Sequence, residues 1–563
     1  MILSLIKGAY RKCPMPLRRR ISGFQKGCAR LMARLVASAG FKPIRVGNIP
    51  PDLSCKQPAP QPQPSAAAME FAEASTHIGD FPVDWFEPRD LLTPWRFDFA
   101  AKHIYARLRE NGVDSDWGRF VYAFHLSIWN GFFEDAPRKV SEADFLEAFH
   151  RIIDATRQAT GRGLRSPVPL VRNGAPLDGA HRIVAALLLD KSVACIKTDV
   201  NSDLVDYDHR FFESRAALAG FAQASDIFDA MALEFCRLLP NIAIAVKFPA
   251  AKGRDDEVDR ILSEHAAIFY RKAVTFENDG PVHLMRVLYE DEPWLGTYET
   301  DFDGARRKAG SCFHRRRPVQ FFLLAYADQG ELVQAKARVE GLFGRSNQSM
   351  HITNTRGEAL RVAKLAFSNS SIRFVNARSL QEMPAFYQLL SAYRNALAWV
   401  EDTDDFCIDG SAVMAAYGIR DCAEIEYISH GDRQLNAGSD ALIGYHKEYG
   451  EHYPGKTLDD IVFHHCNHFY LNGMKFVSLG NVREWKRARD EPEDQVDVAF
   501  IDAWAARHPA SVIDASARLT TRHIGSSLSS ARKRMIRSMK TSTLNSVRRK
   551  IIKWIKGAPP TRR

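Results

Sequence analysis

The sequence contains no Cys-x-x-Cys pair, and its nine cysteines are widely separated. This spacing excludes a zinc ribbon and indicates no disulfide framework, so a reducing cytoplasm fits best. The chain also lacks any run of roughly 18 to 20 uncharged apolar residues, which predicts that it does not cross a membrane. Because 45% of the residues are hydrophobic and 26% are charged, the sequence is unlike a disordered or collagen-like protein.

Acidic residues are missing from both ends of the chain. Residues 1–50 hold 11 Lys and Arg, residues 516–563 hold 14, and neither segment contains Asp or Glu. The net charge of +10 therefore belongs to the tails, because residues 51–515 hold 52 basic against 67 acidic residues. This distribution predicts two basic tails on an acidic body, and such a body is unsuited to wrapping DNA.

Both tails, residues 1–50 and 511–563, have the pattern of basic amphipathic helices. Between Arg18 and Val36, and again around Trp554, apolar residues recur at helical spacing among Lys and Arg. Helices of this kind lie in the membrane interface, where each cation adds about 1 kcal/mol on an anionic surface. We therefore expect a cytoplasmic protein bound peripherally to the inner membrane face. A nucleic-acid-binding arm, or an organelle transit peptide at the N-terminus, is the alternative.

Changes in composition predict several modules between the tails. Residues 51–68 have the Pro, Gln and Ser content of an extended linker. A helical region that ends in an α/β motif follows over 69–215, an α/β module of unknown role covers 216–400, and a second α/β unit covers 401–510. The expected fold class is α/β (α+β) and multidomain.

Local patterns predict individual elements. Apolar residues at 3.6-residue spacing predict helices over Phe99 to Leu108, Trp117 to Phe133, Ala143 to Thr160 and Glu257 to Glu264. Short β-rich runs predict strands over Asn241 to Phe248, Val282 to Tyr289 and Val319 to Tyr326. Thr355-x-x-Glu358 has the spacing of a capping box at the start of a further helix.

The first motif that carries chemistry is Asp178-Gly179-Ala180-His181-Arg182, which follows a short strand pattern and opens a helix. Gly179 lets the backbone approach a ligand closely. The free N–H groups of the helix start, with His181 and Arg182 beside them, form an anion site. The pattern predicts phosphate binding, and the alternative is a capped helix with an incidental His-Arg pair.

Residues 167–196 around this motif resemble the phosphate loop of the ParB/sulfiredoxin superfamily, in which a Gly-x-His-Arg loop precedes a helix. The resemblance implies that Asp178, Gly179, His181 and Arg182 bind nucleotide phosphates. Ala180 stands where sulfiredoxins carry their catalytic cysteine, so reductase chemistry is not implied.

The second motif runs from Phe406 to Ile428 and has the pattern of a strand, a Gly410-Ser411 turn, a helix and a second strand. Glu424 and Glu426 are spaced i, i+2, which on a strand points both side chains to one face. Two carboxylates on one face can hold Mg²⁺ against triphosphate oxygens. The alternative is a solvated strand edge.

The segment from 401 to 503 resembles the DNA polymerase beta-type nucleotidyltransferases, which carry a Gly-Ser turn, a helix and an Asp-x-Asp pair. The resemblance implies ATP or another nucleoside triphosphate as cosubstrate and Mg²⁺ as cofactor. It assigns triphosphate to Gly410 and Ser411, metal to Glu424 and Glu426, and phosphate charge to Lys475 and Lys486. This chain departs from the family in having Glu-x-Glu, and only Asp459 or Asp460 is close enough in sequence to supply a third carboxylate.

Two weaker signals remain. The run His464 to His468 contains zinc-binding residue types, but strand alternation would let only His464, Cys466 and His468 converge. In the middle module, Lys336, His351 and Asn354 are expected to line a pocket.

Together these patterns predict a nucleotidyl- or phosphoryl-transferase. Its partners would be a nucleotide, a glycan or sugar-phosphate acceptor, and an anionic membrane surface bound through both tails. The combination is similar to enzymes of bacterial surface-polysaccharide or phospho-glycan biosynthesis. The alternatives are a non-catalytic, nucleic-acid-associated ParB-like protein and a degenerate scaffold whose acids no longer bind metal.

Overall fold

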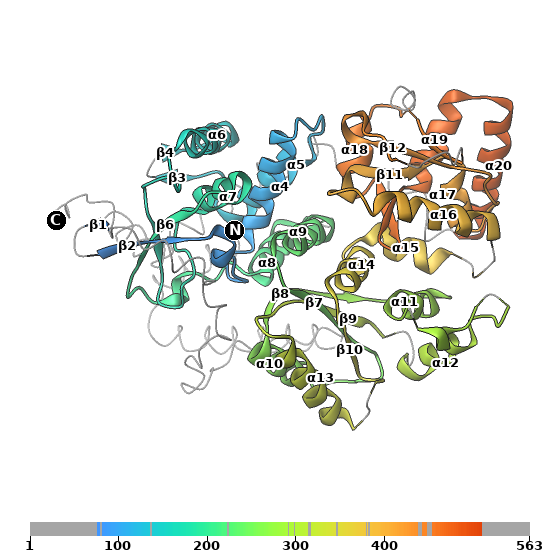
Figure 1. Cartoon of the computed structure of the whole chain (residues 1–563), viewed down its shortest axis with the longest axis horizontal. Coiled ribbons are helices and arrows are strands. Elements are labelled where there is room, and N and C mark those ends of the chain that lie inside the picture. Colours follow the sequence, from blue (N-terminus) through green and yellow to red (C-terminus); the bar gives the residue numbers. More distant parts are fainter. Residues whose placement is uncertain are drawn as a thin grey trace, which may run out of the picture. The chain divides into compact units, whose positions relative to one another are not determined.

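The computed structural model describes residues 76–78 and 81–508, apart from 136–137, 222–223, 291, 298, 314–316, 345–346, 379, 381–382, 437–441 and 447–452. The linker of residues 51–68 and both predicted amphipathic tails lie outside these residues. The described chain is a mixed α/β structure with several small sheets (Figure 1). None of the helices within the described ranges is long and apolar enough to span a bilayer.

The first sheet contains β1 (Thr76–Ile78), β2 (Phe81–Phe86), β6 (Val193–Lys197) and β5 (Val168–Leu170), in that spatial order. The pairs β1/β2 and β2/β6 are antiparallel, whereas β5 and β6 are parallel. Helix α7 (Ala180–Leu189) joins β5 to β6, because two parallel neighbours require a crossover connection. The Asp178 to Arg182 motif therefore stands at the start of a crossover helix, as its pattern predicted.

Five further helices of this module pack against α7 and against one another. They are α4 (Asp98–Glu110), α5 (Trp117–Trp129), α6 (Glu142–Gln158), α8 (His209–Ala219) and α9 (Ala224–Leu238), with a short hairpin of β3 (Glu134–Asp135) and β4 (Arg138–Lys139) before α6. Of the four helices expected from periodicity, the three in this region, α4 to α6, are confirmed. A complete capping box starts α6: the Ser141 hydroxyl accepts from Asp144 N, and the Asp144 carboxylate accepts from Ser141 N.

The middle sheet contains β10 (Met350–Ile352), β7 (Ile242–Lys247), β9 (Val319–Ala325) and β8 (Ala267–Val274), in that spatial order, and all neighbours are antiparallel. Helix α10 (Asp255–His265) follows β7, and α13 (Gln329–Phe343) follows β9. This is the split β-α-β topology of ferredoxin-like folds. Both helices lie on one face of the sheet (Figure 1) and bury a separate apolar cluster against it.

An insertion between β8 and β9 holds α11 (Gly280–Leu288) and α12 (Asp303–Cys312). The prediction of a strand over Val282 to Tyr289 is therefore wrong. The run is apolar on nearly every side and is buried as a helix, and periodicity alone does not separate a buried strand from a buried helix. Pro281 in the first helical turn was the signal for a helix start. After β10 follow α14 (Arg356–Ala366), α15 (Asn369–Ala377) and α16 (Pro384–Leu397).

The C-terminal sheet orders its strands β13-β12-β11-β15-β14 and mixes parallel and antiparallel pairs. Its elements are β11 (Phe406–Asp409), α17 (Ser411–Ala416), β12 (Ile425–Ser429), β13 (Ile443–Tyr445), α18 (Leu458–Phe463), β14 (His468–Leu471), β15 (Met474–Val477), α19 (Leu479–Arg489) and α20 (Pro492–Arg507). The predicted succession of strand, turn, helix and strand from Phe406 to Ile428 is confirmed.

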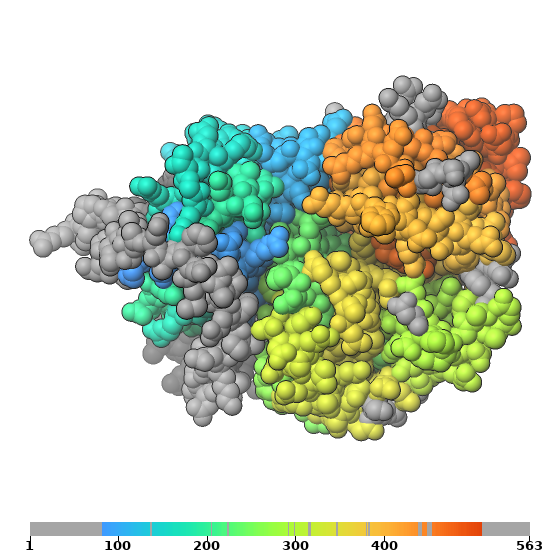
Figure 2. All heavy atoms as spheres, in the orientation of Figure 1, coloured from blue at the N-terminus to red at the C-terminus, as the bar shows by residue number. Residues whose placement is uncertain are grey.

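The three sheets share one continuous apolar core, which runs from Leu91 to Trp504. Polar contacts reinforce it: the Asp114 N–H donates to Asp459 Oδ2 at 2.7 Å, and the Ser115 hydroxyl donates to Asp460 Oδ1 at 2.6 Å. In Figure 2, light-blue atoms from this part of the chain lie beside the orange atoms of the C-terminal module. The described residues consequently belong to one compact unit.

Candidate functional site

The turn between β11 and α17 brings the backbone of Gly410 against the side chain of Glu426. Gly410 has φ +62° and ψ −139°, a conformation that favours glycine. A Cβ atom at this position would lie 2.3 Å from Glu426 Oε2. The glycine that the sequence places between Asp409 and Ser411 is therefore what allows a carboxylate from β12 to reach this turn.

Asp409 and Glu426 are opposite each other on neighbouring antiparallel strands. Residues Phe406 to Asp409 of β11 pair with Ser429 to Glu426 of β12, so Asp409 and Glu426 are register partners. Side chains of register partners share a face of the sheet and have Cβ atoms about 4.5–5.5 Å apart. Two acids therefore meet from two neighbouring strands, whereas the pair predicted from the sequence was Glu424 and Glu426 on one strand.

The Asp409 carboxyl is fully buried, with 0% of the residue exposed. The Tyr453 hydroxyl donates a hydrogen bond to its Oδ2 atom at 2.5 Å, while Oδ1 has no hydrogen-bond partner in the part of the chain that the structure describes. Burial raises the pKa of Asp409 to about 6, the charge of Glu426 acts in the same direction, and the hydrogen bonds from Tyr453 and from Gly410 N–H oppose it. An orphaned oxygen on a buried acid is the environment that a cation would stabilise.

Glu426 is held by a histidine. Its Oε1 atom lies 2.7 Å from Nε2 of His446, and 15% of the Glu426 side chain is exposed. The site thus combines one buried acid, one partly exposed acid and an imidazole. His446 and Tyr453 were not expected from the sequence, because both lie on the long connection after β13. Asp409 had a local signal, since it ends an apolar strand directly before a Gly-Ser turn.

Glu424 does not belong to this arrangement. Strand β12 starts at Ile425, so Glu424 lies in the bend before it, and its side chain is exposed. The alternation that was expected to align Glu424 with Glu426 applies only within a strand. The structure therefore pairs Glu426 with Asp409, not with Glu424.

The third carboxylate expected from the family pattern is engaged elsewhere. Asp459 Oδ1 lies 2.9 Å from His430 Nδ1, and Asp460 forms the capping box that starts α18. Among the residues that the structure describes, no group of three or more His, Cys, Asp or Glu side chains is arranged to hold a metal ion. This finding also removes support for a zinc site in the run His464 to His468.

Lys475 is a buried residue of β15. Its ammonium donates to the Val462 carbonyl at 2.9 Å and also to the Asp404 carbonyl. Only 5% of Lys475 is exposed, and this burial lowers the pKa of its ammonium. These bonds tie β15 to α18 and to the start of β11, so Lys475 does not reach the Gly410 turn.

Lys486 is also buried and paired. Its Nζ atom lies 2.9 Å from Asp494 Oδ1 and 2.9 Å from Asp497 Oδ2. Arg489 binds Asp494, and Arg420 binds Asp497 at 2.7 Å. The Lys486 cluster, defined by these five residues, joins α19 to α20 and to the segment after α17. Lys486 was expected to bind phosphate, and this geometry does not support that role.

The start of α7 uses Arg182 internally. Gly179 has φ +79°, and a Cβ there would lie 2.7 Å from Val168 Cγ2. Arg182 Nη1 donates to the Ser166 and Pro167 carbonyls at 2.7 and 2.8 Å. The Arg182 guanidinium therefore secures the chain entering β5. The glycine is required for close packing of strand and helix.

His181 faces the interior of the same module. Its Nε2 atom lies 2.8 Å from the Tyr122 hydroxyl, and its ring centroid lies 4.5 Å from that of Phe149. Burial, followed by the charges of Lys102 and Lys139, holds the pKa of His181 well below its usual value. Asp178 is half-buried just before the helix.

Near His181 lies a buried ionic cluster that the sequence did not reveal. Asp98 binds Arg96 at 2.8 Å and Lys102 at 2.6 Å, and Lys102 Nζ lies 3.2 Å from His125 Nε2. Burial lowers the pKa of Lys102 to about 8, although Asp98 favours the charged ammonium. Burial of these residues was not expected from the helical pattern of α4. Charged residues are seldom fully buried unless they are paired, and the sequence does not show the pairing.

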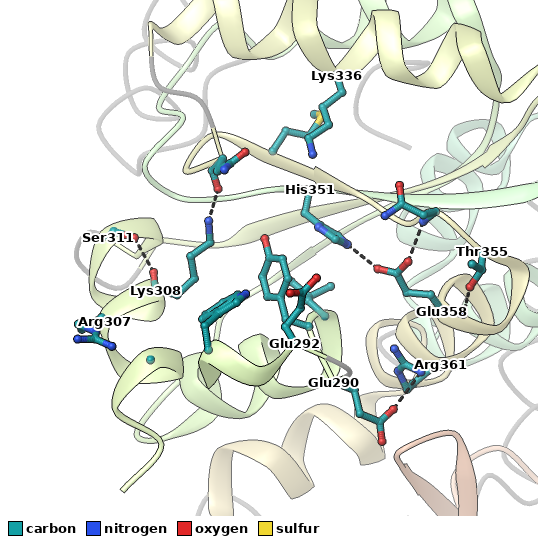
Figure 3. Close-up of a pocket in the computed structure, with 17 residues that line it drawn as sticks. Glu290, Glu292, Arg307, Lys308, Ser311, Lys336, His351, Thr355, Glu358 and Arg361 are labelled. Atoms are coloured by element: carbon teal, nitrogen blue, oxygen red, sulfur yellow. Dashed lines mark hydrogen bonds and ion pairs between the residues drawn. The ribbon is translucent and has the colours of Figure 1, made fainter. Parts of the chain in front are cut away.

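A cavity of about 780 Å³ opens in the middle module, between the insertion and the edge of the sheet. Lys336, His351 and Asn354 line it, as the sequence predicted (Figure 3). His351 Nε2 lies 2.7 Å from Glu358 Oε1, and Glu358 Oε2 accepts from the Asn354 N–H at 2.7 Å. The Thr355 hydroxyl caps α14, but the Glu358 carboxylate binds His351 and Asn354, so the predicted capping box is formed only in half.

Comparisons of this chain with protein-family models, with curated proteins and with solved structures find no match.

Proposed function

We propose that the chain is a Mg²⁺-dependent nucleotidyl- or phosphoryl-transferase whose reaction takes place at the Gly410 turn. The observation that carries the proposal is the cross-strand pair of Asp409 and Glu426 beside that turn. Gly410 and Ser411 keep the role expected for them, next to the phosphates of ATP or another nucleoside triphosphate. Asp409 replaces Glu424 as the second acid.

The two carboxylates fit a magnesium ion that is shared with substrate. Mg²⁺ in phosphoryl-transfer sites is commonly held by one or two carboxylates, with phosphate oxygens and water completing its shell. Asp409 Oδ1 is buried without a hydrogen-bond partner among the described residues, which supports a ligand at this atom. When bound, the ion would neutralise the charge that develops on the phosphate oxygens.

The proposed reaction replaces one P–O bond of the nucleotide with a bond to the acceptor. An acceptor hydroxyl oxygen attacks a phosphorus atom of the nucleotide, a new O–P bond forms, and the P–O bond to pyrophosphate or to the nucleoside diphosphate breaks. The hydroxyl proton passes to water, and Asp409 and Glu426 would hold the ion. His446 orients Glu426 through the 2.7 Å contact.

The acceptor and the location follow from the resemblance stated for the sequence. We propose a glycan or sugar-phosphate acceptor, in bacterial surface-polysaccharide or phospho-glycan biosynthesis. The basic tails would keep the protein peripherally on the inner membrane face in the cytoplasm. The proposal makes no use of Lys475, Lys486 or Arg182, because each of these cations is bonded within the fold.

The test compares acids inside and outside the pair. The purified full chain is titrated with ATP and CTP, with and without Mg²⁺, and transfer of labelled phosphate from both nucleotides to sugar phosphates is followed. Glu426→Gln and Asp409→Asn should abolish Mg²⁺-dependent binding and transfer. Glu424→Gln is the matched control and should behave as the wild type, because Glu424 is exposed outside the strand.

Two results would contradict the proposal. Nucleotide binding that does not depend on Mg²⁺ would remove the role of the carboxylate pair. Full transfer by the Glu426→Gln variant would remove the catalytic role of this site, and a scaffold would then be the better interpretation.

A further inference from the structure

The 780 Å³ cavity in the middle module has the size and composition of a small-molecule site. Ligand pockets commonly enclose about 300–1,000 Å³ and combine aromatic walls with a few convergent polar groups. One wall comes from the insertion between β8 and β9, and the other comes from α13, β10 and the start of α14 (Figure 3). None of its lining residues takes part in the Gly410 turn.

Aromatic side chains form one side of the cavity. The ring centroids of Tyr289 and Trp294 lie 5.1 Å apart, and those of Tyr289 and His351 lie 5.0 Å apart. Trp294 is 41% exposed, although a large apolar ring of this kind is usually covered. An exposed indole at the edge of a cavity offers a flat apolar face with a polar N–H, which suits the C–H face of a sugar ring.

Four cationic side chains and three acidic ones, Glu290, Glu292 and Glu358, line the cavity. Arg307, Lys308 and Lys336 line it, and Figure 3 shows Lys336 pointing from α13 toward His351. Lys308 donates one hydrogen bond, to the Asn347 carbonyl at 2.6 Å, and an ammonium has three donors. Lys336 has no hydrogen bond or ion pair with any residue that the structure describes, so its full charge is available to a ligand.

The acids of the cavity are largely engaged. Arg361 binds Glu290 at 2.9 Å, which neutralises both groups. Glu358 accepts from Asn354 N and holds the His351 ring, which is itself only 6% exposed. Glu292 remains as an exposed carboxylate, suited to accept hydrogen bonds from hydroxyl groups.

We propose that this cavity binds an anionic sugar, either a phosphorylated hexose or a uronic acid, with its acidic group between Lys308 and Lys336 and its ring against Trp294. The cations bind the acidic group, and the aromatic wall contacts the sugar ring. Glu292 and His351, which Glu358 orients, bind the hydroxyl groups of the sugar. This inference does not rest on the proposed transferase function, because the cavity shares no residue with the Gly410 turn.

The experiment measures binding to the full-length chain by calorimetry, without nucleotide. The probes are glucose 1-phosphate, glucuronic acid, neutral glucose and inorganic phosphate. We expect one or both anionic sugars to bind at least about tenfold more tightly than glucose and than inorganic phosphate. The two anionic probes distinguish a phosphate ligand from a carboxylate ligand.

Matched variants test the two walls. Lys336→Met and Trp294→Ala should each weaken binding of the anionic sugar by about tenfold or more. The controls are Lys252→Met and Trp399→Ala, since Lys252 is exposed and Trp399 is 89% exposed, and neither lines the cavity. The controls should bind as the wild type does, and circular dichroism should show the same fold in all four variants.

Three outcomes would overturn the proposal: binding of neither anionic sugar, equal binding of neutral glucose, or wild-type affinity in both Lys336→Met and Trp294→Ala. Should Trp294→Ala fail to fold, Lys336→Met and Lys308→Met carry the test. Loss of transferase activity in these variants is not required, so failure of this proposal and failure of the proposed function remain distinguishable.

Discussion

The Tyr453 hydroxyl donates a 2.5 Å hydrogen bond to Oδ2 of Asp409 and leaves Oδ1 of the same buried carboxyl without a partner in the described structure. The hydrogen bonds from Tyr453 and from Gly410 N–H do not compensate for the burial of a full negative charge, because an isolated carboxylate loses far more on leaving water. The raised pKa of Asp409, about 6, is the consequence. The charged Asp409 carboxylate therefore destabilises the folded chain, and a bound cation would reduce this effect.

The first prediction concerns the pH dependence of stability. Because the folded-state pKa of Asp409 is about 6 and its usual value is 3.8, the folded chain holds this proton more tightly than the unfolded chain. Its stabilising effect is complete below pH 4 and is lost as the pH rises through 6. Asp409→Asn should therefore exceed the wild type in free energy of unfolding at pH 8 by about 3 kcal/mol and match it near pH 4. Urea unfolding at both pH values measures this, and an equal difference at both would contradict it.

The second prediction concerns the Lys486 cluster. Lys486→Met leaves Asp494 and Asp497 buried with one cation each, Arg489 and Arg420. We expect a loss of about 2 to 4 kcal/mol in the free energy of unfolding, somewhat below the usual cost of breaking a buried pair because those cations remain. The matched control is Arg487→Met, since the Arg487 side chain is 46% exposed and its pair with Asp502 lies at the surface. Thermal denaturation should show little change for the control.

The third prediction separates two roles of Arg182. If the guanidinium holds the Ser166 and Pro167 carbonyls, Arg182→Ala should lower the free energy of unfolding by about 2 to 3 kcal/mol. Affinity for nucleotides and for inorganic phosphate should stay the same under conditions where the variant is folded. A large loss of phosphate affinity with unchanged stability would instead support the phosphate-loop interpretation.

The fourth prediction concerns the tails, which lie outside the described residues. The full-length chain should sediment with anionic vesicles and be released at high salt, because the attraction is screened over about 8 Å at physiological ionic strength. Removal of residues 1–50 together with 516–563 should abolish the binding. Equal sedimentation with neutral vesicles would show that charge is not the cause.

Some of this architecture could be predicted because its determinants are local. The helices from Asp98 to Gln158 and the strand from Ile242 to Lys247 follow from the period of their apolar residues. The Gly410-Ser411 turn also follows from local composition. The cavity was anticipated in part, since Lys336, His351 and Asn354 were expected to line a pocket and do so.

Other features depend on neighbours that are distant in the sequence. The segment from Val282 to Leu288 is a helix buried on nearly all sides, and its apolar run alone is equally compatible with a buried strand. Lys475 and Lys486 have the same charge as a phosphate-binding lysine, but the carbonyls and carboxylates around them are set by the packing of α18, α19 and α20.

The sequence by itself determined that an acid-bearing strand, a Gly-Ser turn, a helix and a second acid-bearing strand follow one another between Phe406 and Ile428. Only the tertiary structure decided which acids meet. Within one strand the partner of Glu426 would be Glu424, but β12 begins after Glu424 and the antiparallel register with β11 places Asp409 opposite Glu426. Register is set by which faces of two strands are buried together, and that is a property of the assembled sheet.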